Sequence, residues 1–382
     1  MTVFDPVWEA LDAQVAAGRF PGYAAAVRHA GRSETRVGGR MSVEPGSRPM
    51  AQDTLFRIAS VTKPMGGALT LSLVHDGVLA LDDPISRWLP EAADPRVLVT
   101  PDAPLDRTVP AERPITVWHL LSGTSGWGVT MEDTPRQQAM TARGVFPGAL
   151  PPRMSADEFV ARVTGIPLAF QPGDGWRYDT GVDLLGVLLT RAAGKPLSDL
   201  IAERITGPLG MASTGFWTAE VDRLATAYTP GGRGLDVLDL PNGIFAAPPD
   251  FEKLSGGLVS TVGDVLRFYT ALADGGAPVL TSESVALMTT NALTGEQRRQ
   301  AGPLVGAGRS WGLGTGVDVT LVDPWQSPGR WGWTGGTGTT ADVDPAREVV
   351  SVLLTQRAMA GPLDGFDYFW RAVAAAADDG RK

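Results

Sequence analysis

The sequence of 382 residues contains no cysteine, only three histidines and only four lysines. Without cysteine the chain can form no disulfide, no thiolate nucleophile and no thiolate-ligated zinc or iron–sulfur centre. The three histidines, His29, His75 and His119, restrict Ser-His-Asp catalysis to very few arrangements. Arginine supplies all the other basic side chains. A lysine inside a chemical motif is therefore informative, because lysine can lose its proton and arginine cannot.

Charge and hydropathy argue against two classes of protein, those that bind nucleic acid and those that span a membrane. The formal net charge is −9 and no cluster of basic residues offers a surface for nucleic acid. No stretch approaches 18 uncharged apolar residues, so we expect no membrane span. The first residues lack the basic start and apolar core of a secretory signal, which predicts a cytoplasmic protein. The content of 43% hydrophobic and 20% charged residues is typical of globular proteins.

Strand patterns lie at both ends of the chain and helical patterns lie between them. Strands are predicted at 23–28, 34–37, 55–58, 313–321, 337–343 and 349–355, and helices at 1–20, 61–76, 116–121, 155–163, 182–193, 197–205 and 363–377. This order predicts an α/β (α+β) fold, in which one antiparallel sheet built from both ends is flanked by the N- and C-terminal helices. We expect a sheet domain of residues 1–82 and 255–382, an inserted, mostly helical domain of residues 83–254, and a site at their interface.

Two serines stand in motifs of nucleophilic catalysis, and the first is Ser310. The segment 308–312 reads G-x-S-x-G, a pattern that requires a preceding strand, a following helix and a later histidine. The last histidine is His119, so we interpret this match as accidental. A Ser-His-Asp triad in another chain order stays open, although no serine–histidine pair has a local signature.

The second serine, Ser60, lies in an S-x-x-K motif with Lys63, directly after the predicted strand 55–58 and at the start of a predicted helix. The N-terminal N–H groups and dipole of a helix favour an oxyanion. Residues i and i+3 share a helix face, which places the Lys63 amine beside the Ser60 hydroxyl. We expect burial and nearby positive potential to lower the pKa of Lys63 and make it a usable base. The alternative is an exposed capping serine and a solvated lysine.

Further motifs follow in the order of a known superfamily. Residues 170–180 approach Tyr178 through a proline and a glycine, residues 119–126 read HLLSGTSG, and residues 333–335 read WTG before a predicted strand pair. Together with S-x-x-K, these segments resemble the serine β-lactamase and penicillin-recognising superfamily. The closest branch is the family VIII carboxylesterases with a class C β-lactamase fold. The resemblance covers essentially the whole chain and implies a β-lactamase/transpeptidase-like fold.

The resemblance also implies roles for individual residues. Ser60 is the acylated nucleophile, and Lys63 and Tyr178 are coupled acid–base groups whose division of labour stays open. The backbone N–H groups of Ser60 and Gly336 form the oxyanion hole. The resemblance implies no metal and no cofactor.

Two positions depart from the β-lactamase pattern. Thr180 replaces the asparagine found two residues after the tyrosine, which weakens recognition of an acyl amide. Trp333 replaces the lysine or histidine of the third motif and exchanges a cation for an apolar surface, unless Arg330 or Arg357 restores the charge. Both changes favour neutral substrates. We expect a substrate pocket lined by Trp333, Thr334, Gly335, Thr180, Trp127, Trp176 and Trp311.

The sequence therefore predicts a carboxylesterase that cleaves small-molecule esters through a Ser60 acyl-enzyme and has at most weak β-lactamase activity. The alternatives are an acyltransferase with the same residues, a β-lactamase or a D-amino-acid-directed peptidase. An alternative of another class is a penicillin-binding or sensor module that is acylated once without turnover. The oligomeric state stays open.

The two serine motifs make opposite predictions about mutation. Ser60→Ala should abolish ester hydrolysis, because it removes the nucleophilic oxygen, whereas Ser310→Ala should leave most of the activity. Hydrolysis of a p-nitrophenyl ester by both purified variants measures this difference. Normal turnover by Ser60→Ala would contradict the resemblance on which the fold prediction depends.

Overall fold

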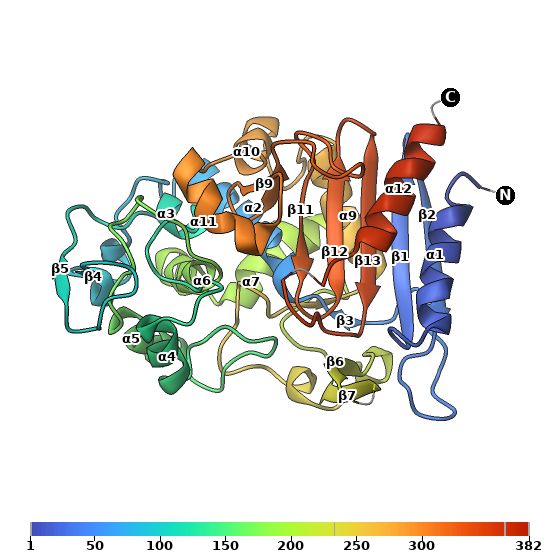
Figure 1. Ribbon diagram of the computed structural model, residues 1–382, viewed down its shortest axis with the longest axis horizontal. Coiled ribbons are helices and arrows are strands. Elements are labelled where there is room, and N and C mark those ends of the chain that lie inside the picture. The colour runs from blue at the N-terminus through green and yellow to red at the C-terminus, as the bar shows by residue number, and fades with distance from the viewer. Residues whose placement is uncertain (1, 233, 363, 381–382) are drawn as a thin grey trace.

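The computed structural model describes residues 2–232, 234–362 and 364–380. Its centre is a seven-stranded antiparallel sheet with the order β2-β1-β13-β12-β11-β10-β9 (Figure 1). The N-terminal hairpin joins the C-terminal strands where Ala26 lies opposite Val352. The prediction that both chain ends share one antiparallel sheet is therefore confirmed. The strands are β1 (Gly22–His29), β2 (Arg32–Gly39), β9 (Arg309–Trp311), β10 (Gly316–Asp318), β11 (Trp331–Gly335), β12 (Thr339–Asp344) and β13 (Val349–Thr355).

Helices cover both faces of the sheet, because successive side chains of the central strands point into two different apolar layers. On one face, α1 (Asp5–Ala16) and α12 (Asp367–Asp379) share an apolar cluster with Tyr23 and Ala25 of β1. On the other face, α9 (Val262–Ala273) packs against β1, β12 and β13, and α2 (Thr62–His75) packs against β11. Figure 1 shows α1 and α12 together at the end of the molecule that carries both termini.

Between β3 (Phe56–Arg57) and β8 (Val259–Ser260) the chain contains more helix than strand, and these two short strands pair with each other outside the main sheet. The buried helix α6 (Thr180–Ala193) packs against α2 and α3. The other elements up to β9 are α3 (Val117–Ser122), α4 (Pro135–Ala142), α5 (Ala156–Thr164), α7 (Leu197–Ile201), α8 (Gly207–Leu209), α10 (Ser282–Met288), α11 (Gly295–Val305), β4 (Arg96–Leu98), β5 (Thr108–Pro110), β6 (Ala227–Gly231), β7 (Gly234–Asp239), and the short turns η1 (Ala59–Val61), η2 (Ile85–Arg87), η3 (Pro90–Ala92), η4 (Ala202–Thr206), η5 (Val221–Arg223) and η6 (Ile244–Ala246). The domain boundaries at residues 83 and 254 stay a prediction.

Several predicted elements differ from the structure at their ends. The predicted strand 313–321 is reduced to β10, because the chain turns at Gly314, whose φ is 82°. The predicted helix 197–205 ends at Ile201 and continues as the π-helical turn η4. The final helix begins at Asp367, and residue 363, where we predicted its start, lies outside the described residues. Within the described ranges, no helix is long and apolar enough to cross a bilayer.

The end of β11 is held against the segment that precedes Ser60. The Thr339 hydroxyl, at the start of β12, donates a hydrogen bond of 2.8 Å to the Ile58 carbonyl. Gly335 makes this approach possible, because a Cβ at that position would overlap both the Ile58 carbonyl and the Thr339 hydroxyl. The close contact fixes the distance between β11 and the turn that carries Ser60.

Two adjacent glycines test this contact. Gly335→Ala should destabilise the protein by about 1 to 3 kcal/mol and reduce ester hydrolysis, because the methyl group forces β11 away from Ile58. Gly336→Ala is the matched control for stability, since a Cβ there meets no atom within 4 Å. Urea unfolding of both variants measures the difference, and turnover of Gly335→Ala is compared with that of the wild type. A Gly335→Ala protein as stable as the control and as active as the wild type would show that the contact does not position the site.

Candidate active site

Ser60 lies in the strained turn η1, which follows β3 and precedes α2 in the chain. The preceding residue, Ala59, has a φ of 43°, in the left-handed region that is unfavourable for a residue with a Cβ. Ala59 and Val61 are buried, whereas Ser60 is partly exposed. The turn therefore presents one hydroxyl between two buried neighbours. We predicted that the helix begins at Ser60. This prediction was wrong, because Ser60 lies in the preceding turn η1 and α2 begins at Thr62.

Lys63 lies one turn further along the chain and is fully buried. Its Nζ donates to Ser60 Oγ at 2.8 Å, to the Ser255 carbonyl at 2.7 Å and to the carboxylate of Asp179. The same nitrogen lies 4.5 Å from the centre of the Tyr178 ring. The structure thus brings together the three side chains that the sequence motifs singled out.

The charge state of Lys63 differs from the sequence-based expectation. Burial lowers the pKa of the amine, but the surrounding negative charges, that of Asp179 foremost, outweigh burial and raise the pKa above its ordinary value. Burial likewise raises the pKa of Asp179, and the cations of Lys63 and Lys253 outweigh it and hold that pKa below the usual range. The expectation of a lowered Lys63 pKa is therefore wrong, because an anion, and not a cation, is its nearest charged neighbour.

Tyr178 lies against Lys63 from the other side of the site. Its backbone forms a bridge with Val129 just before α6 begins. Its hydroxyl accepts a hydrogen bond of 2.6 Å from the indole N–H of Trp333, on β11. The phenol oxygen is thus fixed by a donor from the sheet, while the ring contacts the ammonium on α2.

Asp179 was missed by the sequence analysis, although it directly follows Tyr178. Its φ of 78° turns the carboxylate towards Lys63. The second carboxylate oxygen accepts from the Ser255 hydroxyl at 3.2 Å and lies 3.7 Å from Nζ of Lys253. Two of the four lysines of the chain, Lys63 and Lys253, contact this one carboxylate. Because lysine is so rare in this sequence, a search for the acidic partners of these two lysines was the signal that could have found Asp179.

Three of the predicted pocket tryptophans gather around Tyr178. The ring centres of Trp176 and Trp311 each lie 5.9 Å from that of Tyr178, and the ring centre of Trp333 lies 5.8 Å from it. Trp311 and Trp333 meet edge to face at 4.6 Å. Thr334 is partly exposed next to this aromatic cluster. The three tryptophans form a buried aromatic cluster, which we call the aromatic wall. That they line a substrate pocket stays a prediction.

Two predicted pocket residues lie elsewhere. Trp127 is 1% exposed in the main core and its indole N–H donates to the Ile166 carbonyl at 3.0 Å, so it does not join the aromatic cluster. Thr180, the first residue of α6, is also 1% exposed, and its hydroxyl has no hydrogen-bond partner among the residues that the structure describes. Closeness to a motif in the sequence did not place either side chain at the aromatic wall.

The competing serine motif has a structural role. Ser310 lies on β9, is fully buried and donates its hydroxyl hydrogen to Asn291. His119, the last histidine, caps α3 by accepting from the Thr116 N–H at 3.1 Å, and burial lowers its pKa. This geometry supports the interpretation of the G-x-S-x-G match as accidental.

The chain resembles a known protein family along almost its whole length. The Beta-lactamase family model matches residues 8–376, almost the entire chain. The chain belongs to the Beta-lactamase family. Protein Rv1367c of Mycobacterium tuberculosis is 40% identical over 328 residues, which cover 81% of this chain and 79% of that protein. Esterase EstB of Burkholderia gladioli is 34% identical over 364 residues, which cover 88% of this chain and 86% of EstB.

Solved structures with a similar fold support the same assignment. The structure of EstCE1, a hydrolase with promiscuous acyltransferase activity, superimposes with a TM-score of 0.81 at 24% identity and covers 98% of this chain and 97% of its own. The predicted superfamily and fold are confirmed. The family and these relatives identify a hydrolase or an acyltransferase.

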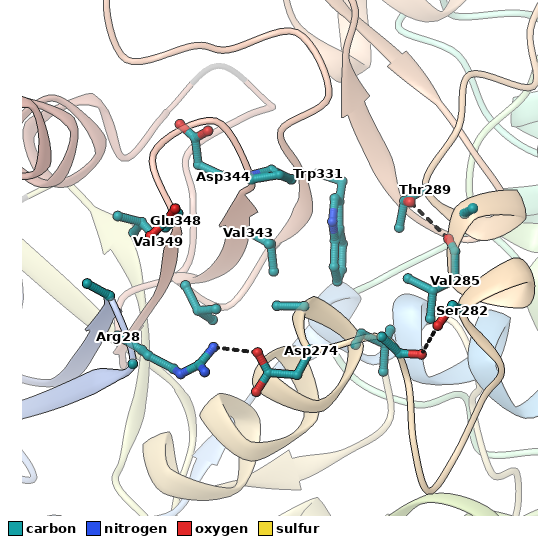
Figure 2. Close-up of a pocket in the computed structure, with 18 residues that line it drawn as sticks. Arg28, Asp274, Ser282, Val285, Thr289, Trp331, Val343, Asp344, Glu348 and Val349 are labelled. Atoms are coloured by element: carbon teal, nitrogen blue, oxygen red, sulfur yellow. Dashed lines mark hydrogen bonds and ion pairs between the residues drawn. The ribbon is translucent and has the colours of Figure 1, made fainter.

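Two cavities lie in different parts of this Beta-lactamase family member. One of about 520 Å³ lies beside the β12–β13 turn, where Arg28 and Asp274 form an ion pair of 2.9 Å and Trp331 faces the space (Figure 2). Ser60, Lys63 and Tyr178 do not line it. A smaller cavity of about 190 Å³ is bordered by Trp333 and Thr334 of β11, and Ser60, Lys63 and Tyr178 do not line this one either. Of the aromatic wall, the smaller cavity reaches Trp333.

The Tyr178 hydroxyl can be tested with a matched pair of variants. Tyr178→Phe should lower kcat by about 100-fold or more while the protein stays folded, because it removes one oxygen from the site and keeps the ring. Tyr269→Phe is the control, since the Tyr269 hydroxyl is buried beside Trp331 and has no hydrogen-bond partner in the described part of the chain. Steady-state ester hydrolysis measures both. A Tyr178→Phe enzyme as active as the control would exclude an acid–base function of Tyr178.

Proposed function

We propose that this protein is a serine carboxylesterase that cleaves neutral esters through an acyl-enzyme on Ser60. The observation that carries the proposal is the 2.8 Å contact between Lys63 Nζ and Ser60 Oγ, with the Tyr178 ring against the same ammonium. A partly exposed hydroxyl beside a buried cation and a phenol has the composition of a nucleophile with its acid–base partners. The similarity to esterase EstB supports the same reaction class.

In the proposed reaction, Ser60 Oγ attacks the ester carbonyl and the Lys63–Tyr178 pair takes the hydroxyl proton. The backbone N–H groups of Ser60 and Gly336 would bind the oxyanion, and each such donor contributes about 3 to 4 kcal/mol in the transition state. The proton then passes to the departing alkoxide, so that an alcohol leaves and the acyl group stays on Ser60. Water, or a second alcohol, releases the acyl group by the reverse sequence.

The charges around β11 favour a neutral substrate. Trp333 stands at the position where a cation would meet a substrate carboxylate. Arg330 is buried and paired with Asp342 at 3.1 Å, and Arg357 is paired with Asp364 at 2.6 Å. Both arginines that could replace the missing cation are therefore engaged by carboxylates. Apolar side chains around Tyr178, those of Trp176, Trp311 and Trp333, would favour an ester with a modest alkyl or aryl group.

Substrate preference can be measured directly. The wild-type protein should hydrolyse p-nitrophenyl butyrate with a kcat/KM well above that for a chromogenic cephalosporin. Ser60→Ala, at the same concentration, controls for contaminating esterases. A much faster lactam reaction would replace the esterase proposal by a β-lactamase, and a single stoichiometric burst without turnover would replace it by a sensor module.

Trp333→Lys tests the origin of this preference. The ratio of kcat/KM for the cephalosporin to kcat/KM for the neutral ester should rise by an amount equivalent to about 1 to 3 kcal/mol, because the ammonium can pair with the lactam carboxylate. Trp333→Phe is the control, since it also loses the N–H donor to Tyr178 but adds no charge. If both variants show the same ratio, Trp333 does not determine the choice between charged and neutral substrates.

A further inference from the structure

Lys63 has no hydrogen-bonding capacity left over. An ammonium group carries three N–H donors and no lone pair. The Nζ of Lys63 has three acceptors, which are Ser60 Oγ, the Ser255 carbonyl and the Asp179 carboxylate. Each acceptor comes from a different segment of the chain, and the side chain is completely buried. In this arrangement the nitrogen donates to Ser60 and cannot accept the serine proton.

The carboxylate that completes this set is itself held firmly. Asp179 has a positive φ, and its second oxygen accepts from the Ser255 hydroxyl. Ser255 also donates its N–H and its hydroxyl to Asp183, at 2.8 and 2.9 Å. Lys253 lies 3.7 Å from Asp179 and donates to the Gly148 carbonyl at 2.9 Å.

The buried cluster holds two lysines, Lys63 and Lys253, and two carboxyl groups, Asp179 and Asp183. Asp179 lies between the two lysines, with one oxygen towards each. Burial raises the pKa of Asp183 to about 6; Lys253 opposes this rise and the neighbouring Asp179 adds to it. Asp179, and not Asp183, is therefore the carboxylate that directly neutralises Lys63.

We infer that Asp179 is a positioning residue, which keeps Lys63 as an ammonium aimed at Ser60 Oγ. This inference rests on the proposed acylation of Ser60. Lys63 then orients the Ser60 hydroxyl by donating to its oxygen and keeps all three of its protons throughout, so it is not the group that takes the serine proton.

The scarcity of lysine makes the ionisation of Lys63 directly measurable. Protein labelled with 13C at the lysine ε carbon should give one signal for each of four lysines, and Lys63→Arg identifies the signal of Lys63. The groups that face this amine are Tyr178, Asp179, Asp183 and, through Asp179, Lys253. We expect the Lys63 signal of the wild-type protein to show no titration between about pH 6 and pH 10. A titration within that range would overturn the inference.

Asp179→Asn provides the second readout. Without the anion, burial should bring the titration of Lys63 into the same range, and kcat at pH 8 should fall by about 100-fold with little change in KM. The alkaline limb of the pH profile of kcat/KM should move to lower pH. Asp183→Asn is the matched control, because it changes a neighbouring carboxylate that does not contact Lys63, and its alkaline limb should stay in place.

Failure of this inference can be told apart from failure of the proposed function. If Asp179→Asn and the wild type show the same Lys63 titration and the same alkaline limb, the role of Asp179 is refuted, and the proposed function is not affected. The carbon signal is recorded without substrate, so it decides the charge of Lys63 whatever reaction the protein catalyses. Should Asp179→Asn not fold, the wild-type titration still decides between an ammonium and a neutral amine.

Discussion

The buried ammonium of Lys63 is the interaction on which the rest of the site depends. Removal of a charge from water is costly unless the charge is paired and all of its donors are satisfied. Here α2 supplies the cation, and the acceptors come from the turn at Ser60, from Asp179 just before α6 and from the chain at Ser255. The three segments must therefore meet at one point. The Trp333–Tyr178 hydrogen bond adds the sheet to the same assembly.

A second group of buried charges lies next to the aromatic wall. Arg309 lies 2.9 Å from Asp318, and its guanidinium stands 5.4 Å from the centre of the Trp333 ring. Arg330 pairs with Asp318 and Asp342. Arg309 supports Trp333, whereas Arg330 lies over Trp325 and Trp370. Both guanidiniums are neutralised by carboxylates, so they offer little charge to a ligand. This pairing of the buried charges is consistent with chemistry on an uncharged ester.

The sequence predicted the features that depend on local spacing and missed those that depend on distant contacts. Ser60 and Lys63 are three residues apart, and the strands at both ends were visible from their alternating or extended patterns. Asp179 meets Lys63 across 116 positions, and its positive φ has no signature in the sequence. The lowered pKa expected for Lys63 was wrong for the same reason. Trp127 lies near a motif in sequence but packs in the core, since neighbouring positions can point to different layers.

The acyl-enzyme itself is the most direct test of the central claim. Wild-type protein mixed with a slowly released activated ester and quenched in acid within the first turnover should gain the mass of one acyl group, and peptide mapping should locate that group on Ser60. An unmodified protein that nevertheless turns over the ester, or an acyl group on any other residue, would contradict the account.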